Sequence, residues 1–98
     1  YYRPPWGHLN LWTLFFIRKW NLKLILWDVM ANDWSARETA ESIREKILSR
    51  VFPGAVLCLH DGRGAVRAPE RTIEALKESL PVLIEQGYSF ERMDAYEY

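Results

Sequence analysis

The alternation of apolar, β-rich runs with helical patterns is the feature that most limits how this chain can fold. The runs cover residues 22–27, 55–60 and, in a shorter form, 88–90. Continuous apolar runs of this length favour buried parallel strands over half-exposed antiparallel strands. We therefore predict an α/β fold in which parallel strands alternate with helices.

Helical patterns occupy the segments between the runs. Residues 9–20 are apolar on most of the helix circumference, which predicts a buried helix capped by Asn10. Ser35 and Glu38 have the spacing of a capping box and predict the start of a second helix. That helix is expected to end at residues 52–54, Phe-Pro-Gly, because proline cannot continue it.

A third helix is predicted to start near Pro69, since proline suits the first turn of a helix. Pro81 interrupts its apolar stripe, so we expect a kink or two short helices, ended by Gly87. The stripe that should face the core consists of Ile73, Leu76, Leu80, Leu83 and Ile84.

The order of these elements predicts part of a (β/α) barrel. Successive parallel βα steps over residues 1–98 amount to roughly half of an eight-stranded barrel. A half barrel leaves two unpaired sheet edges. We expect the missing half of the barrel, or a second copy of the chain, to cover them.

Charge and apolar patterning exclude some classes of protein. The 13 basic and 13 acidic residues cancel and form no long basic block, so nucleic acid is not an expected partner. Apolar stretches such as residues 14–17 are far too short to span a bilayer, and no transmembrane segment is expected. Cys58 is the only cysteine, so no intrachain disulfide can form, and its leucine neighbours suggest a small buried hydrophobe.

Polar residues fall at the predicted ends of strands, where α/β proteins gather functional groups. Arg3 lies near the start of the chain, Asp33 and Trp34 follow the first full strand, and His60 follows the second. Together they suit acid–base chemistry. Each also has a structural interpretation: a surface charge for Arg3, a helix-start residue for Asp33, a core aromatic for Trp34 and a hydrogen-bonded structural histidine for His60.

Three short segments carry a resemblance to a known family. Residues 2–7 (YRPPWG), 27–34 (WDVMANDW) and 56–62 (VLCLHDG) resemble, in order and spacing, the last three of five signature motifs of the polysaccharide deacetylases of carbohydrate esterase family 4. The tail from residue 72 to residue 88 is similar to the last helix and strand of that family. The resemblance implies that residues 1–98 are the C-terminal half of a catalytic domain with a distorted (β/α) barrel.

The resemblance also implies catalytic roles for three residues. His60 would be the general acid that protonates the leaving amine of the sugar. Asp33 would pair with His60 and favour its imidazolium form. Arg3 would orient a catalytic-base aspartate that lies in the absent first motif.

Three further residues would meet the substrate. The backbone N–H of Trp6 would lie near the developing oxyanion. Trp34 and Leu59 would line a small apolar pocket for the acetyl methyl group. Most relatives have tyrosine at the position of Trp6, and tryptophan keeps the N–H while changing the wall of the substrate groove.

The family binds one divalent metal ion, often zinc, through an aspartate and two histidines of its first two motifs. This chain has only His8 and His60, so we assign it no metal ligands. Met30 occupies a position that is often acidic in the family, and Asp28 is a conceivable local substitute. The isolated chain is therefore predicted to be inactive.

The function expected for the intact protein is removal of N-acetyl or O-acetyl groups from a polysaccharide or oligosaccharide. Peptidoglycan, chitin oligomers and acetylated xylan all stay open as substrates. The resemblance suggests the cell envelope or the extracellular space as the location. The alternatives are a carbohydrate-binding relative that has lost catalysis, which the methionine of the second segment favours, and a free-standing α/β domain of other function.

Overall fold

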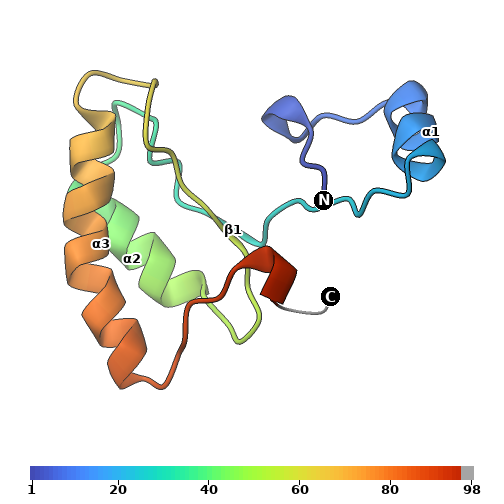
Figure 1. Cartoon of the computed structure of the whole chain (residues 1–98). Coiled ribbons are helices and arrows are strands. Elements are labelled where there is room, and N and C mark those ends of the chain that lie inside the picture. The colour runs from blue at the N-terminus through green and yellow to red at the C-terminus, as the bar shows by residue number, and fades with distance from the viewer. Residues whose placement is uncertain (96–98) are drawn as a thin grey trace.

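The structure, a computed structural model, describes residues 1–95 of the chain (Figure 1). No helix in this part of the chain is long and apolar enough to cross a membrane. In chain order the elements are η1 (Pro5–Gly7), α1 (Leu11–Lys19), β1 (Val29–Met30), α2 (Ala40–Arg50), β2 (Leu57–Cys58), α3 (Ala68–Glu85) and η2 (Met93–Ala95).

The strands pair in parallel, as the sequence predicts. Val29 lies opposite Leu57 in the ladder between β1 and β2. An isolated parallel bridge joins Tyr2 to Leu24, so three successive segments of the chain lie in parallel order. With helices between the strands, this is the α/β arrangement of a partial (β/α) barrel, and the predicted fold class is confirmed.

The first predicted strand is displaced along the sequence. Within residues 22–27 only Leu24 pairs, and the ladder forms two residues beyond that run, at β1. The backbone N–H of Asp28 and that of the next residue both donate to Val56 O, at 2.8 and 3.1 Å. Pairing with residues 55–60 therefore starts at Asp28 and Val29, where these two bonds fix the register. It does not start at residue 22, where the first apolar run begins.

The third predicted strand, residues 88–90, is wrong. In the described chain these residues pair with no strand, although Tyr88 packs against the hydrophobic core. A strand exists only where a neighbouring backbone accepts and donates its hydrogen bonds. The short segment 88–90, which follows a glycine turn, has no such neighbour in the described chain.

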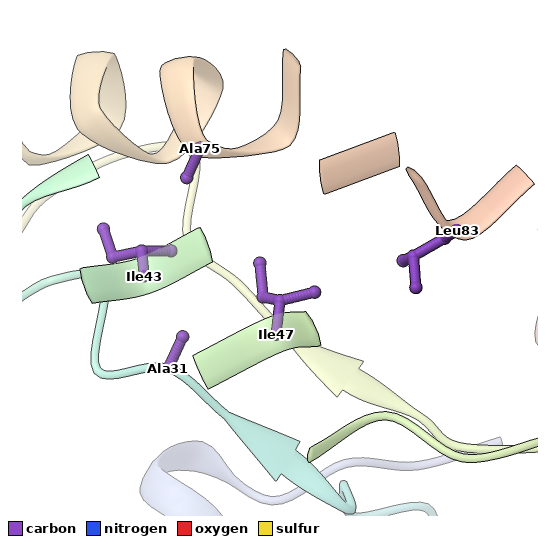
Figure 2. Packing of buried hydrophobic residues seen from close by; sticks show 5 residues of the cluster. All are labelled: Ala31, Ile43, Ile47, Ala75 and Leu83. Atoms are coloured by element: carbon purple, nitrogen blue, oxygen red, sulfur yellow. The ribbon is translucent and has the colours of Figure 1, made fainter. Parts of the chain in front are cut away.

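The core lies between β1, α2 and α3. Figure 2 shows Ile43 and Ile47 of α2 between Ala31, which follows β1, and the α3 residues Ala75 and Leu83. All five are at most 1% exposed. Full burial of an isoleucine or leucine side chain contributes roughly 1.5–3 kcal/mol, so the contact between α2 and α3 holds this part of the fold together.

The core-facing stripe of α3 differs from the predicted one. Leu83 is buried, and Leu76 packs against the core from its edge, as expected. Ile73 and Ile84 are 55% and 60% exposed, and the prediction is wrong for them. The buried line instead runs through Thr72, Ala75, Ser79 and Leu83, which share one face at helical spacing.

Pro81 does not divide the third helix. α3 is a single helix of 18 residues that passes through Pro81, so the expectation of two short helices is wrong. Proline removes one helical hydrogen bond, but its ring is exposed here and meets no packed surface. Packing of α3 along α2 outweighs the missing bond. The predicted start of the helix near Pro69 is confirmed.

Helix α1 forms where it was expected but is not buried. Asn10 caps it, with the Thr13 backbone N–H donating to Asn10 Oδ1 at 2.8 Å. Leu11 and Trp12 are 84% and 72% exposed, so the prediction of a buried helix is wrong. Figure 1 shows α1 apart from α2 and α3, and no other helix or strand of the described chain covers its apolar side chains.

The second helix starts later than predicted. Ser35 Oγ accepts from the Arg37 backbone N–H at 3.2 Å, which makes a local turn. The capping box is formed instead by Thr39 and Ser42, each accepting from the backbone N–H of the other. Two pairs of residues with capping-box spacing lie close together in the sequence, Ser35 with Glu38 and Thr39 with Ser42. The second pair begins the helix.

Glu38 gives a first testable prediction, on the pH dependence of stability. Hydrogen bonds from Lys46 and Ser42 lower the pKa of Glu38 below its ordinary value of 4.5. A lowered pKa in the folded state stabilises the fold above the unfolded-state pKa, and this contribution is lost as the pH falls through the folded-state pKa. Glu38→Gln should therefore lower stability at pH 7 by less than about 1 kcal/mol and have a smaller effect at pH 3. Urea unfolding of both proteins at the two pH values measures this, and a difference as large at pH 3 as at pH 7 would contradict it.

Candidate acid–base site

Asp33 and His60 lie together at the carboxyl ends of neighbouring parallel strands. Asp33 follows β1 by three residues and His60 follows β2 by two. Because β1 and β2 pair directly, the segments that leave them at the same end are adjacent. His60 Nδ1 lies 2.8 Å from Asp33 Oδ1, and the His60 backbone N–H donates to Asp33 Oδ2 at 2.7 Å.

The buried carboxylate of Asp33 is compensated by three donors. Asp33 is 0% exposed, and the third donor is the hydroxyl of Thr72, which lies 2.9 Å from Oδ2. A buried charge is tolerated only when hydrogen bonds replace its lost water. With two donors at Oδ2 and the ring nitrogen of His60 at Oδ1, this geometry suits a carboxylate that accepts from an N–H at His60 Nδ1.

This arrangement leaves His60 Nε2 as the ring nitrogen that can exchange a proton with another molecule. The side chain of His60 is 39% exposed, so a substrate can reach it. A histidine whose Nδ1 is held by a carboxylate is fixed in one orientation, with Nε2 directed away from that carboxylate. Chemically, the pair can serve as a general acid or a general base.

The loop after His60 packs closely on the backbone of Trp34. The Ala65 N–H donates to Trp34 O at 2.9 Å. A Cβ built on Gly64, whose φ is +78°, would lie 2.8 Å from that oxygen and 2.9 Å from Trp34 Cβ. Position 64 therefore admits only glycine, and the side chain of Trp34 is 46% exposed at the edge of the site.

Two residues at the start of α3 were not predicted as part of the site. Thr72 reaches Asp33, and Arg71 donates to Ser35 O at 3.2 Å and to Val66 O at 3.1 Å. Arg71 thus joins the two loops that follow Asp33 and His60. No sequence signal pointed to Thr72, because the predicted core-facing stripe of α3 ran through Ile73 and Leu76, whereas the structure buries Thr72.

Arg3 and Leu59 line a cavity that is separate from the acid–base pair. They line a space of about 890 Å³ bordered by the C-terminal half of α3, and neither Asp33 nor His60 lines it. Arg3 Nη2 contacts Met93 Sδ at 3.7 Å. The structure therefore does not place Arg3 in contact with the acid–base pair. Burial raises the pKa of the nearby Cys58 thiol, and the positive charge of Arg3 acts against that effect.

Trp6 lies in the η1 turn, outside the acid–base pair. Its φ and ψ are 58° and 8°, and backbone bonds from Gly7 to Pro4 O and from His8 to Pro5 O hold the turn on both sides. Trp6 is 89% exposed, so its indole is free to meet a ligand. The structure does not bring it into contact with Asp33 or His60.

Asp28 is not a substitute for the missing acidic residue. Its Oδ2 accepts from the Val56 backbone N–H at 2.8 Å. Asp28 precedes β1, whereas Asp33 follows it, so the two carboxylates lie at opposite ends of the strand. Met30 itself contributes a backbone oxygen to Arg50 Nη1, at 3.1 Å.

The residues that the structure describes do not fit a metal ion. Within residues 1–95, no three histidine, cysteine, aspartate or glutamate side chains lie close enough together to hold one. The pair of Asp33 and His60 offers two such groups, and both are engaged with each other.

Similar proteins include two curated deacetylases, although no protein-family model matches the sequence. A peptidoglycan-N-acetylglucosamine deacetylase of Bacillus cereus is 33% identical over 91 residues, which cover 91% of this chain and 41% of that protein. A chitooligosaccharide deacetylase of a Bradyrhizobium species is 33% identical over 97 residues, covering 88% of this chain and 42% of that protein. The chain thus spans less than half the length of these relatives.

Solved structures agree with these sequence relatives. A peptidoglycan N-acetylglucosamine deacetylase in complex with a naphthalenyl N-oxidanyl-benzamide superposes with a TM-score of 0.84 at 26% identity, over 95% of this chain and 42% of that one. A family 4 carbohydrate esterase from Streptomyces lividans, in complex with acetate, gives a TM-score of 0.70 at 28% identity, over 87% of this chain and 40% of that one. Together with the three sequence segments, these similarities support the assignment of this chain to a part of a polysaccharide deacetylase of carbohydrate esterase family 4.

Proposed function

We propose that residues 1–98 form the C-terminal half of the catalytic domain of a metal-dependent deacetylase that removes N-acetyl groups from peptidoglycan or chitin oligomers. The observation that carries this proposal is the hydrogen-bonded pair of Asp33 and His60 at the ends of two parallel strands. The relatives named as peptidoglycan and chitooligosaccharide deacetylases support the substrate class. A polysaccharide without net charge also suits a chain whose own charges cancel.

In this function His60 acts as the general acid. Hydrolysis of an acetamide adds water across the C–N bond: the acyl carbon gains oxygen, and the nitrogen must gain a proton as it leaves. His60 Nε2 supplies that proton, while Asp33 holds Nδ1 and offsets the positive charge of the ring. The exposure of the ring allows the sugar nitrogen to reach it.

The remaining predicted residues have roles around this step. Trp34 forms apolar surface for the acetyl methyl group, and the backbone N–H of Trp6 stabilises the developing oxyanion. Arg3 orients a base that belongs to another part of the domain. The divalent metal ion of the family, which we propose to be zinc, takes its ligands from that other part as well, because the described residues do not fit it.

The rest of the domain is also the proposed cover for the open surfaces of this chain. The two-stranded sheet has free edges, and the apolar side chains of α1 are exposed. Relatives more than twice as long have the additional chain that such a cover needs. We propose the cell envelope or the extracellular space as the location, where peptidoglycan and chitin oligomers occur.

Acetate release tests this function. The full-length protein, incubated with N-acetylglucosamine oligomers or with peptidoglycan, is expected to release acetate and to expose an equal amount of free amine. Residues 1–98 alone are expected to release none. If the full-length protein binds the oligomers but releases no acetate, the proposed deacetylase activity is wrong, and a carbohydrate-binding relative is favoured.

A further inference from the structure

Thr72 places a buried hydroxyl against the carboxylate of the acid–base pair. It is 5% exposed and lies in the second turn of α3, an element that carries neither Asp33 nor His60. Its Oγ1 lies 2.9 Å from Asp33 Oδ2 and 3.1 Å from Ala68 O. The hydroxyl has one proton, and the ionised carboxylate is the stronger of the two acceptors.

We propose that Thr72 is a positioning residue for the general acid: by donating to Asp33 Oδ2 it fixes the carboxylate so that Oδ1 faces His60 Nδ1. The inference rests on the function proposed above for His60. Thr72 does not touch the substrate in this role. It acts through Asp33, which in turn sets the tautomer and the orientation of the imidazole.

The hydrogen bonds of Asp33 explain why a second donor on Oδ2 is needed. The His60 backbone N–H already donates to Oδ2, at 2.7 Å, and the ring of the same residue meets Oδ1. Both of these donors belong to one segment of the chain. Thr72 supplies the only one of the three donors that comes from α3, so it fixes the rotation of the carboxylate against an independent element.

Folding alone does not require this hydroxyl to reach Asp33. Ser79, two turns further along the same face of α3, is 0% exposed and bonds only to the carbonyl of Ala75, at 2.7 Å. Thr72 could satisfy its hydroxyl in the same way with Ala68 O. The contact with Asp33 is therefore an addition to what the buried face of the helix needs, and Ser79 is a matched control for it.

Arg71 shows that this end of α3 is fixed relative to the site. Its guanidinium donates to Ser35 O and to Val66 O, which lie in the loops after Asp33 and His60. The start of α3 is thus tied to both loops through their backbones. From this fixed position the Thr72 hydroxyl can hold Asp33 in one orientation.

The test compares Thr72→Val, Thr72→Ser and Ser79→Ala in the full-length protein. Thr72→Val keeps the shape of the side chain without the hydroxyl, and loss of a hydrogen bond to a charged group should lower kcat about tenfold with KM within about twofold. Thr72→Ser should recover kcat to within about threefold. Ser79→Ala should leave kcat unchanged. In proteins labelled with ¹⁵N-histidine, the ring signals of His60 should change in Thr72→Val and stay in place in Ser79→Ala.

A kcat for Thr72→Val within about twofold of the wild type would overturn the proposal. So would an equal loss in Ser79→Ala, because it would assign the effect to the helix and not to the contact. If Thr72→Val does not fold, Thr72→Ala replaces it and is read in the same way. If the wild-type protein releases no acetate, the function proposed above fails, and the His60 ring signals still decide the role of Thr72: unchanged signals in Thr72→Val overturn it.

Discussion

His60→Ala in the full-length protein is expected to reduce acetate release by about a hundred- to ten-thousandfold, the usual contribution of a positioned general acid. The fold should survive the change. The backbone N–H of residue 60, which donates to Asp33 Oδ2, is kept, and only the half-exposed ring and its bond to Oδ1 are lost. Thermal unfolding of the variant should therefore stay close to that of the wild type.

His8→Ala is the matched control, since His8 is the only other histidine in the chain and is exposed. Its rate of acetate release should equal that of the wild type. Added imidazole should restore part of the activity of His60→Ala, because the opening left at an exposed site admits the free base. A rate within a few-fold of the wild type in His60→Ala would exclude the role of general acid.

Asp33→Asn is expected to lower both activity and stability, the rate by about a hundredfold and the free energy of unfolding by about 1–3 kcal/mol. Asp33 is fully buried and accepts three hydrogen bonds. An asparagine must present its NH₂ either to the donors at Oδ2 or to His60 Nδ1. The first choice leaves buried donors facing each other, and the second moves the ring proton to the wrong nitrogen.

Asp28→Asn is the control for this change. Asp28 accepts one backbone N–H, from Val56, and an amide oxygen can accept it equally well. Acetate release by this variant should match the wild type. Urea unfolding and acetate release, measured on both variants, separate the effects, and an Asp33→Asn variant with wild-type rate would show that the carboxylate does not assist His60.

The order of elements could be predicted because it depends on local patterns. Asn10 begins α1 and Pro69 lies in the first turn of α3, as residue chemistry alone indicates. The adjacency of Asp33 and His60 also follows from sequence, since residues that leave neighbouring parallel strands at the same end must meet.

The errors arise where structure depends on a distant partner. The apolar run at residues 22–27 is a good strand sequence, yet its register is set by bonds to Val56, which no local pattern contains. The apolar residues of α1 predicted burial, but burial needs a covering surface that the described chain does not place there.

The contribution of Thr72 was hidden for a related reason. A hydroxyl residue on a helix face is equally compatible with a bond to its own helix, as at Ser79, and with a bond to another element. Only the packing of α3 against the loop after β1 distinguishes the two cases. Arg71 is a similar case. An arginine in a helix usually extends into solvent, but here its guanidinium bridges two loops.

The contact between Gly64 and the backbone of Trp34 limits how this surface can be re-engineered. Any side chain at position 64 would push apart the loop that follows His60 and the loop that carries Trp34. Residues 61–63 of the same loop are exposed and carry no such restriction. Directed evolution toward a new sugar polymer should therefore find its useful changes at residues 61–63, with glycine retained at the next position in every successful variant.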